Sequence, residues 1–148
     1  MEILKIILAT IVATATMTAF IYYVSKRFHK LFKEPVLLNI ILSALGAEMV
    51  PERKNAWGWA IHFMIGLLFV VAYHLIWHFT DIDPTWFTGL IFGIISGLIG
   101  IFSWFFLFKL PPNPPKIHFK QYYLQLFIAH ILFSLSVIAV YRLFLLFE

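Results

Sequence analysis

The sequence predicts an all-α fold, an integral membrane four-helix bundle made of two parallel two-helix hairpin repeats. Only 12% of the 148 residues are charged and 62% are hydrophobic, whereas a soluble domain averages about a quarter charged residues. Four separate stretches are apolar over the roughly 20 residues that a bilayer crossing requires. The second and fourth stretches share one pattern, a histidine followed by a tyrosine eleven positions later. These features exclude a soluble domain and favour a duplicated helical hairpin.

The four predicted spans occupy most of the chain, so we expect a single transmembrane domain over residues 1–148. They are Ile6–Ser25, Trp57–Phe79, Trp86–Phe108 and Gln121–Tyr141. The first span runs into Lys26 and Arg27, which is the stop pattern of a retained helix rather than of a cleaved signal peptide. No span contains Asp or Glu. We therefore expect no buried carboxylate of the kind that a proton-coupled exporter uses, and the absence of cysteine excludes thiol chemistry.

The basic residues indicate the orientation. Nine of the eleven Lys and Arg residues follow the first or the third span, whereas the connection 80–85 carries only Asp81 and Asp83 as charges. Under the positive-inside rule, both termini lie outside and the basic connections are cytoplasmic. We expect those connections to contact anionic lipids and not nucleic acid. The expected location is the bacterial cytoplasmic membrane.

The first cytoplasmic connection is long enough to hold a short helix. Residues 35–46 begin with Pro35, which suits the start of a helix, and end at Gly46, which suits its termination. Apolar residues follow at Val36, Ile40, Leu42 and Leu45. A dozen residues are too few to span, so this segment is predicted to lie in the interface. The second connection contains four prolines between 111 and 115 and is predicted to be extended.

Small residues at helical spacing mark the faces where helices approach closely. These helix-packing candidates are Ala9 and Ala13 in the first span, Gly89, Gly93, Gly97 and Gly100 in the third, and Gly66 and Ser134 four residues after the two histidines. In lipid, helices associate through close van der Waals packing, which small residues permit. Two interpretations remain open: the ridges pack spans two and four, or the glycines leave space for a flat cofactor or a lipid tail.

The candidate ligand-binding residues are the repeated pairs His62 with Tyr73 and His130 with Tyr141. Parallel repeats place the two histidines at similar depth, facing one another. Either histidine could hydrogen-bond a neighbouring helix or contact a small ligand, and together they could serve as the axial ligands of haem b. The tyrosines could be interfacial residues or interhelical donors. No cofactor is determined by the sequence.

Two further histidines, His74 and His78, lie one helical turn apart near the outer end of the second span. The i, i+4 spacing places both on one face, where they could ligate a metal ion. No carboxylate or third histidine accompanies them on that face, so we assign no metal site and keep them as weak candidates.

The chain resembles a class of small bacterial four-helix inner-membrane proteins. The resemblance rests on ATIVATATMT in the first span, His62-FMIG in the second, GLIFGIISG in the third and Ala129-His130 in the fourth. That class has no established activity, so the resemblance implies only a four-helix fold.

Three functional hypotheses follow. The first is a non-enzymatic binding or accessory subunit that uses the glycine-lined bundle and the paired histidines. The second is a b-type haem electron-transfer protein in which His62 and His130 are the axial ligands. The third is a channel or carrier for a small neutral or apolar solute. The expected partners are membrane lipids, with other membrane subunits or a second copy of the chain as further candidates.

Overall fold

The computed structural model describes residues 2–46 and 56–146 and is all-helical over those ranges. Its five helices are α1 (Glu2–Arg27), α2 (Glu34–Ala44), α3 (Ala56–Phe79), α4 (Trp86–Leu107) and α5 (Phe119–Phe144). Four of them, α1, α3, α4 and α5, are long and apolar enough to cross a membrane. These four apolar helices fit the predicted membrane protein, and α2 is too short to span.

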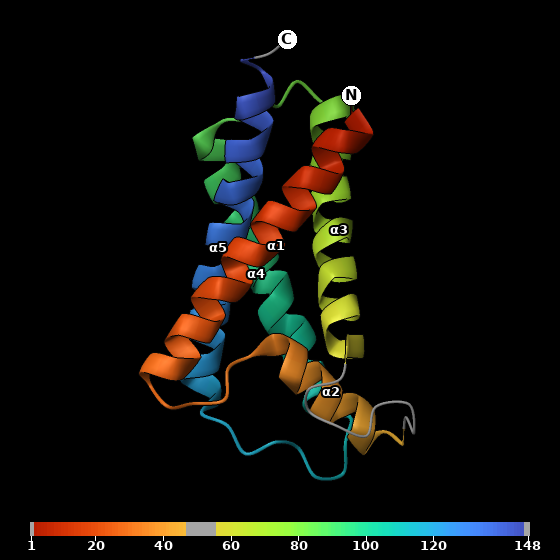
Figure 1. The fold of residues 1–148 in the computed structure, drawn as a ribbon, viewed down its shortest axis with the longest axis vertical. Coiled ribbons are helices and arrows are strands. Elements are labelled where there is room, and N and C mark those ends of the chain that lie inside the picture. Colours follow the sequence, from red (N-terminus) through yellow and green to blue (C-terminus); the bar gives the residue numbers. More distant parts are fainter. Residues whose placement is uncertain (1, 47–55, 147–148) are drawn as a thin grey trace.

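The long helices run side by side, with α1 crossing the others diagonally (Figure 1). The extensive packing is between α4 and α5, α1 and α5, and α1 and α3, while α2 packs on α3. Although a short turn joins α3 and α4, the backbones of these two helices barely approach one another. The N- and C-terminal ends lie at one end of the molecule and α2 lies at the other (Figure 1).

The helices α1, α3 and α5 extend beyond the apolar stretches that predict them. The first helix begins at Glu2 and not near Ile6, and it includes Lys5, whose ammonium lies 3.2 Å from the Glu2 carboxylate. An ion pair at i, i+3 stabilises a helical turn, so the helix continues past its apolar part. The start of α4 at Trp86 agrees with the prediction because Thr85 and Thr88 form a capping box there.

The glycines of α4 allow its close packing on α5. A Cβ atom added to Gly93 would lie 2.7 Å from the Ile131 Cα, and one added to Gly97 would lie 2.8 Å from the Phe127 ring. Gly89 and Gly100 similarly face Ile138 and His130. All four glycines therefore lie at close contacts with α5, and the histidine ring itself is one of the packed groups.

The small residues of α1 are also buried. Ala9 and Ala13 are fully buried. One turn of α1 meets α3 closely, because a Cβ atom added to Gly66 would lie 2.3 Å from the Thr14 Oγ1. The hydroxyl of Ser134 donates a hydrogen bond of 2.7 Å to the Gly89 carbonyl and so joins α5 to α4.

The short helix α2 ends where the sequence indicates. Leu45 caps it, and Gly46 follows with a φ of 82°, the left-handed conformation that glycine adopts readily. The side chains that turn inward are Glu34, Leu37, Leu38 and Ile41, whereas Val36, Ile40 and Leu42 are half-buried and Leu45 is exposed. The inward residues are spaced i, i+3, i+4 and i+7, which places them on one side of a helix.

A close contact fixes α2 against the start of α3. A Cβ atom added to Gly58 would lie only 2.0 Å from the Pro35 carbonyl oxygen. Glycine is therefore required where α3 approaches α2. The Asn39 side-chain oxygen accepts a hydrogen bond of 2.8 Å from the Gly58 N–H. That N–H belongs to the first turn of α3, where no intrahelical acceptor exists. The side chain of Asn39 therefore caps α3 and holds α2 in place.

Candidate functional site

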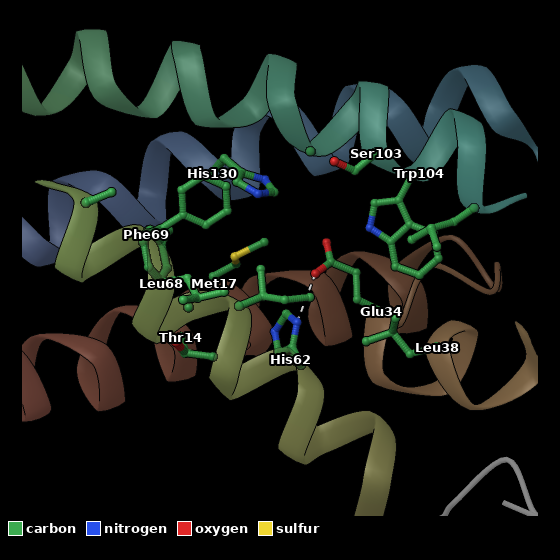
Figure 2. A pocket seen from close by; sticks show the side chains of 16 residues that line it. Thr14, Met17, Glu34, Leu38, His62, Leu68, Phe69, Ser103, Trp104 and His130 are labelled. Carbon is green, nitrogen blue, oxygen red and sulfur yellow. Dashed lines mark ion pairs between the residues drawn. The ribbon is translucent and has the colours of Figure 1, made fainter. Parts of the chain in front are cut away.

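A cavity of about 380 Å³ lies between the helices, and residues from all five helices line it (Figure 2). Most of its wall is apolar, with Met17, Leu38, Phe69, Leu107 and Phe133 among the lining side chains. Its polar groups come from all five helices, one from each: Thr14, Glu34, His62, Ser103 and His130. Small-molecule sites in proteins commonly combine an apolar wall with a few polar groups that orient the ligand.

The cavity opens sideways between α3 and α4. The side chain of Leu68 on α3 lines it and is 62% exposed. Ser103 on α4 also lines it and is exposed. Nearer the connecting turn the same two helices are joined by Tyr73, Trp77 and Phe92, with the Tyr73 and Phe92 ring centroids 4.9 Å apart. The gap between α3 and α4 thus widens only toward the end of the molecule where α2 lies.

His62 is buried and both of its ring nitrogens have partners. Its Nε2 lies 3.0 Å from the Thr18 Oγ1, and its Nδ1 lies 3.2 Å from the Glu34 Oε2. The Thr18 hydroxyl donates its hydrogen to the Thr14 carbonyl at 2.6 Å. A hydroxyl has only one hydrogen to donate, so the Thr18 oxygen must accept from His62, and Nε2 must carry a hydrogen.

This assignment determines the protonation of the pair between His62 and Glu34. With Nε2 protonated, the ion pair between Nδ1 and the Glu34 carboxylate at 3.2 Å requires one further proton between them. That proton gives either an imidazolium facing a carboxylate or a neutral imidazole facing a carboxylic acid. Both forms have a net charge of zero. The pair is therefore an electrically neutral unit that holds one shared proton.

Glu34 is a carboxylate inside the helix packing, although no predicted span contains one. It is 3% exposed and its Oε1 has no hydrogen-bond partner among the described residues. Figure 2 shows its carboxyl group directed toward the cavity, with the ion pair to His62 dashed. The expectation that no buried carboxylate exists was wrong, because the acid comes from α2 and not from a span. Burying a carboxylate of which only one oxygen has a partner costs free energy, and such a group marks a candidate functional site.

His130 lies on the opposite wall of the cavity, on α5. Its Nδ1 donates a hydrogen bond of 2.9 Å to the Leu126 carbonyl, one turn earlier in the same helix. Its other nitrogen, Nε2, is then the unprotonated one in the neutral ring and acts as an acceptor. A Cβ atom added to Gly100 would lie 2.9 Å from this nitrogen, so the ring rests on the α4 backbone.

The structure brings together two of the four predicted ligand-binding residues and separates the others. His62 and His130 line the same cavity, whereas Tyr73 and Tyr141 do not. The Tyr73 hydroxyl donates to the Ser96 hydroxyl at 2.7 Å. The Tyr141 hydroxyl lies 3.2 Å from the His74 Nδ1. Both hydroxyl groups thus form hydrogen bonds between helices, and that of Tyr73 is the donor in its bond.

The weak metal candidates lie at the edge of that aromatic region. The rings of His74 and His78 stack with centroids 6.1 Å apart, and His74 is already engaged by Tyr141. Over the described ranges 2–46 and 56–146, no three His, Cys, Asp or Glu side chains form a group suited to a metal ion.

The positions of His62 and His130 in the structure do not fit bis-histidine haem ligation. Each axial ligand must offer the iron an unprotonated nitrogen. Both nitrogens of His62 are engaged, by Thr18 and by Glu34. Ligation by His62 would require one of these bonds to break and would leave Glu34 buried without its partner. The geometry therefore does not favour the haem hypothesis.

Several residues of the site are not found by reading the spans alone. Glu34 and Asn39 belong to the connection between spans, and Gly58 looks like an ordinary interfacial residue. The available signal is the Lys33-Glu34-Pro35 sequence, where an acid and a proline open a short helix. That signal indicates a helix start but not which way the carboxylate points.

No family model, curated protein or solved structure matches the chain. The site is accordingly interpreted from its own geometry.

Proposed function

We propose that this chain is a non-enzymatic membrane protein that binds a small apolar molecule with one polar end. The observation that carries the proposal is the laterally open apolar cavity with the Glu34 and His62 pair at its polar end. A ligand enters between α3 and α4 from the lipid, where the apolar wall continues the hydrocarbon environment. The polar end of the ligand then meets the side chains that are buried within the helices.

Selectivity comes from the polar end. A molecule that is already dissolved in lipid gains little from moving its apolar part into an apolar cavity. Hydrogen bonds to unpaired buried groups are worth more, because these groups otherwise lose their hydration without compensation. The Thr14 Oγ1 and the Glu34 Oε1 are buried without partners among the described residues. A ligand that satisfies them is favoured over lipid.

The two-hairpin repeat is part of the proposal, with α1 and α3 as one hairpin and α4 and α5 as the other. Its support is that each histidine contacts the first helix of its own hairpin: His62 meets Thr18, and His130 meets Gly100. The small residue one turn later does the same, with Gly66 against Thr14 and Ser134 against Gly89. On α3 and α5 the two contacting positions have the same spacing of one helical turn, which is typical of a duplicated unit.

The membrane placement is proposed from charge and exposure. The basic connections place the α2 end in the cytoplasm and both termini outside, in the cytoplasmic membrane of a bacterium. On α2, Val36 and Ile40 are only half-buried and Leu45 is exposed, which suits a helix that lies in the interface. Lipids, other membrane subunits or a second copy of the chain are the proposed neighbours of the exposed apolar surface.

A binding site is better supported than a path for solutes through the molecule. Tyr73, Phe92 and Tyr141 are buried in the half of the molecule near the termini, and the Trp77 and Tyr141 ring centroids are only 4.8 Å apart. These rings fill the interior beyond the cavity. A solute that reached the cavity would therefore leave by the side through which it entered.

Benzyl alcohol tests the proposal because it combines an apolar body with one hydroxyl donor. Its binding to the protein in lipid nanodiscs is measured by calorimetry, with empty nanodiscs subtracted. We expect saturable binding by the unaltered protein and none by Ser103→Phe, which fills the cavity (Figure 2). Thr16→Phe is the control, since Thr16 is an exposed residue of α1 outside the cavity. Equal binding by both variants, or no saturable binding at all, overturns the proposal.

A further inference from the structure

We infer that the ligand is a primary ammonium with an apolar body, and that it enters the site in exchange for the proton shared by Glu34 and His62. This inference rests on the proposed function and specifies its ligand. It follows from three observations: the neutrality of the buried pair, the surplus of acceptors around the cavity, and the absence of a cation from its described wall.

Most of the polar groups at the site that lack a partner are acceptors, and the Thr14 hydroxyl can also donate. Glu34 Oε1 is an unpartnered carboxyl oxygen, and His130 Nε2 is an unprotonated nitrogen in the neutral ring. His62 Nδ1 becomes a third acceptor as soon as its shared proton leaves. A ligand therefore has to supply the donors. A primary ammonium has three N–H donors and no acceptor, which complements such a site.

Charge distinguishes an ammonium from a neutral donor such as an alcohol. Loss of the shared proton alone would leave a net negative charge inside an apolar environment, at a large cost in free energy. A cation that binds as the proton leaves keeps the site neutral. No Lys or Arg lines the cavity among the described residues. The nearest in sequence, Lys33, holds its ammonium 4.7 Å from the centre of the Tyr22 ring.

The other titratable groups that face the pair do not supply this charge. From α5, His130 and Tyr122 lie close enough to interact electrostatically with Glu34. The α1 residues on the cavity wall are Thr14 and Met17, and the α4 residues are Gly100, Ser103, Trp104 and Leu107, none of which is ionisable in the usual pH range. The shared proton of Glu34 and His62 is thus the one that a bound cation displaces.

The exchange balances in atoms and charge. Before binding, His62 and Glu34 hold one proton between them and the site is neutral. The ammonium then donates hydrogen bonds to the Glu34 carboxylate and to His62 Nδ1, while Nε2 keeps its hydrogen bond to Thr18. One proton leaves to water and one positive charge enters, so the net charge of the site stays at zero.

Three probes of nearly equal shape test the inference: benzylammonium, benzyl alcohol and benzoate. Calorimetry at neutral pH in buffers of different ionisation enthalpy gives the number of protons released per probe bound. We expect benzylammonium to bind the unaltered protein with release of about one proton, because the neutral pair loses its single shared proton. Benzyl alcohol is expected to bind with no proton release, and benzoate is expected not to bind.

The variant Glu34→Gln removes the proton that is exchanged. A charge-assisted hydrogen bond contributes about 1.5–3 kcal/mol, so we expect benzylammonium affinity to fall roughly ten- to a hundredfold, with no proton release. A cooperative thermal unfolding transition in detergent shows that the variant is folded. Glu2→Gln is the matched control, because Glu2 is an exposed acid at the other end of the molecule.

The outcomes separate the inference from the proposed function. If benzyl alcohol binds but benzylammonium does not, or if benzylammonium binds without proton release, the inference is overturned and the binding function stands. If none of the three probes binds, the proposed function itself fails. The proton count is measured on the unaltered protein and decides the inference even if Glu34→Gln does not fold.

Discussion

The side-chain oxygen of Asn39 accepts a hydrogen bond from the backbone N–H of Gly58 at 2.8 Å, and this contact sets where Glu34 meets His62. Glu34 lies on α2 with Asn39, and His62 lies one turn beyond Gly58 on α3. Since both helices are rigid over these distances, docking α2 on the first turn of α3 places the carboxylate against the imidazole. The buried pair is therefore a consequence of how a short helix caps a long one.

Replacing Gly58 by Ala should separate the two helices. Alanine normally stabilises a helix by about 1 kcal/mol relative to glycine. At this position the added Cβ would lie 2.0 Å from the Pro35 carbonyl oxygen, which is backbone and must move. Overpacking costs about 1–3 kcal/mol, so we expect a net loss of stability in thermal unfolding in detergent, together with weaker benzylammonium binding.

Ala60→Gly is the comparison for this variant, because Ala60 is exposed in the same turn. It should lose stability through helix propensity alone and keep benzylammonium binding. Gly58→Ala would contradict the docking contact if it were as stable as the unaltered protein, or more so, and bound the probe normally.

Gly66 and Thr14 should form a compensating pair across α3 and α1. A Cβ atom at position 66 would lie 2.3 Å from the Thr14 Oγ1 but 3.5 Å from the Thr14 Cβ. Threonine is stiff at χ1 and cannot easily turn its hydroxyl away, so Gly66→Ala is expected to destabilise by about 1–3 kcal/mol. Thr14→Ala removes an unpartnered hydroxyl and should cost little.

The double variant is expected to recover most of the loss, because the new methyl group then occupies the space that the Oγ1 leaves. Unfolding free energies of the two single variants and the double variant give the coupling. Strictly additive effects would show that these two side chains do not meet.

The apolar spans were predictable because each is long and free of charge. Since the spans take up most of the chain, its length then limits how the four helices can be arranged. The mutual facing of His62 and His130 on one cavity was also expected from their spacing. The role of the α4 glycines is apparent only once α5 is placed, since the same ridge could have faced a ligand. Of the four glycines, Gly100 alone lines the cavity.

The position of Glu34 could not be predicted from the sequence, for a physical reason. A charged residue at the start of a connecting helix normally lies in water, and nothing local distinguishes an inward from an outward turn. The direction is set by the packing of Leu37, Leu38 and Ile41 and by the hydrogen bond of Asn39.

Reporter fusions test the orientation. We expect a reporter at the C-terminus to be outside and one inserted within Pro111–Pro115 to be cytoplasmic, because nine of the eleven basic residues belong to the connections on the latter side. A cytoplasmic C-terminus would reverse this orientation. The Glu34 end of the cavity would then face the outside of the cell.

An absorption spectrum tests the haem hypothesis. Protein purified from haem-replete cells is expected to show no low-spin haem bands, because both nitrogens of His62 are engaged by other side chains. The opposite result would be a sharp Soret band that is lost in both His62→Ala and His130→Ala but kept in His74→Ala. Such a spectrum would restore the electron-transfer hypothesis.

The occupation of the cavity can be observed most directly at Trp104, whose indole lines it beside Glu34 (Figure 2). Bromine quenches the fluorescence of an adjacent indole, so 4-bromobenzyl alcohol reports binding at contact distance. We expect saturable quenching in the unaltered protein, reversal by excess benzyl alcohol, and loss of the saturable part in both Trp104→Phe and Ser103→Phe. Quenching that rises in proportion to the added probe, equally in all three proteins, would mean that the probe only partitions into lipid and that the cavity binds nothing.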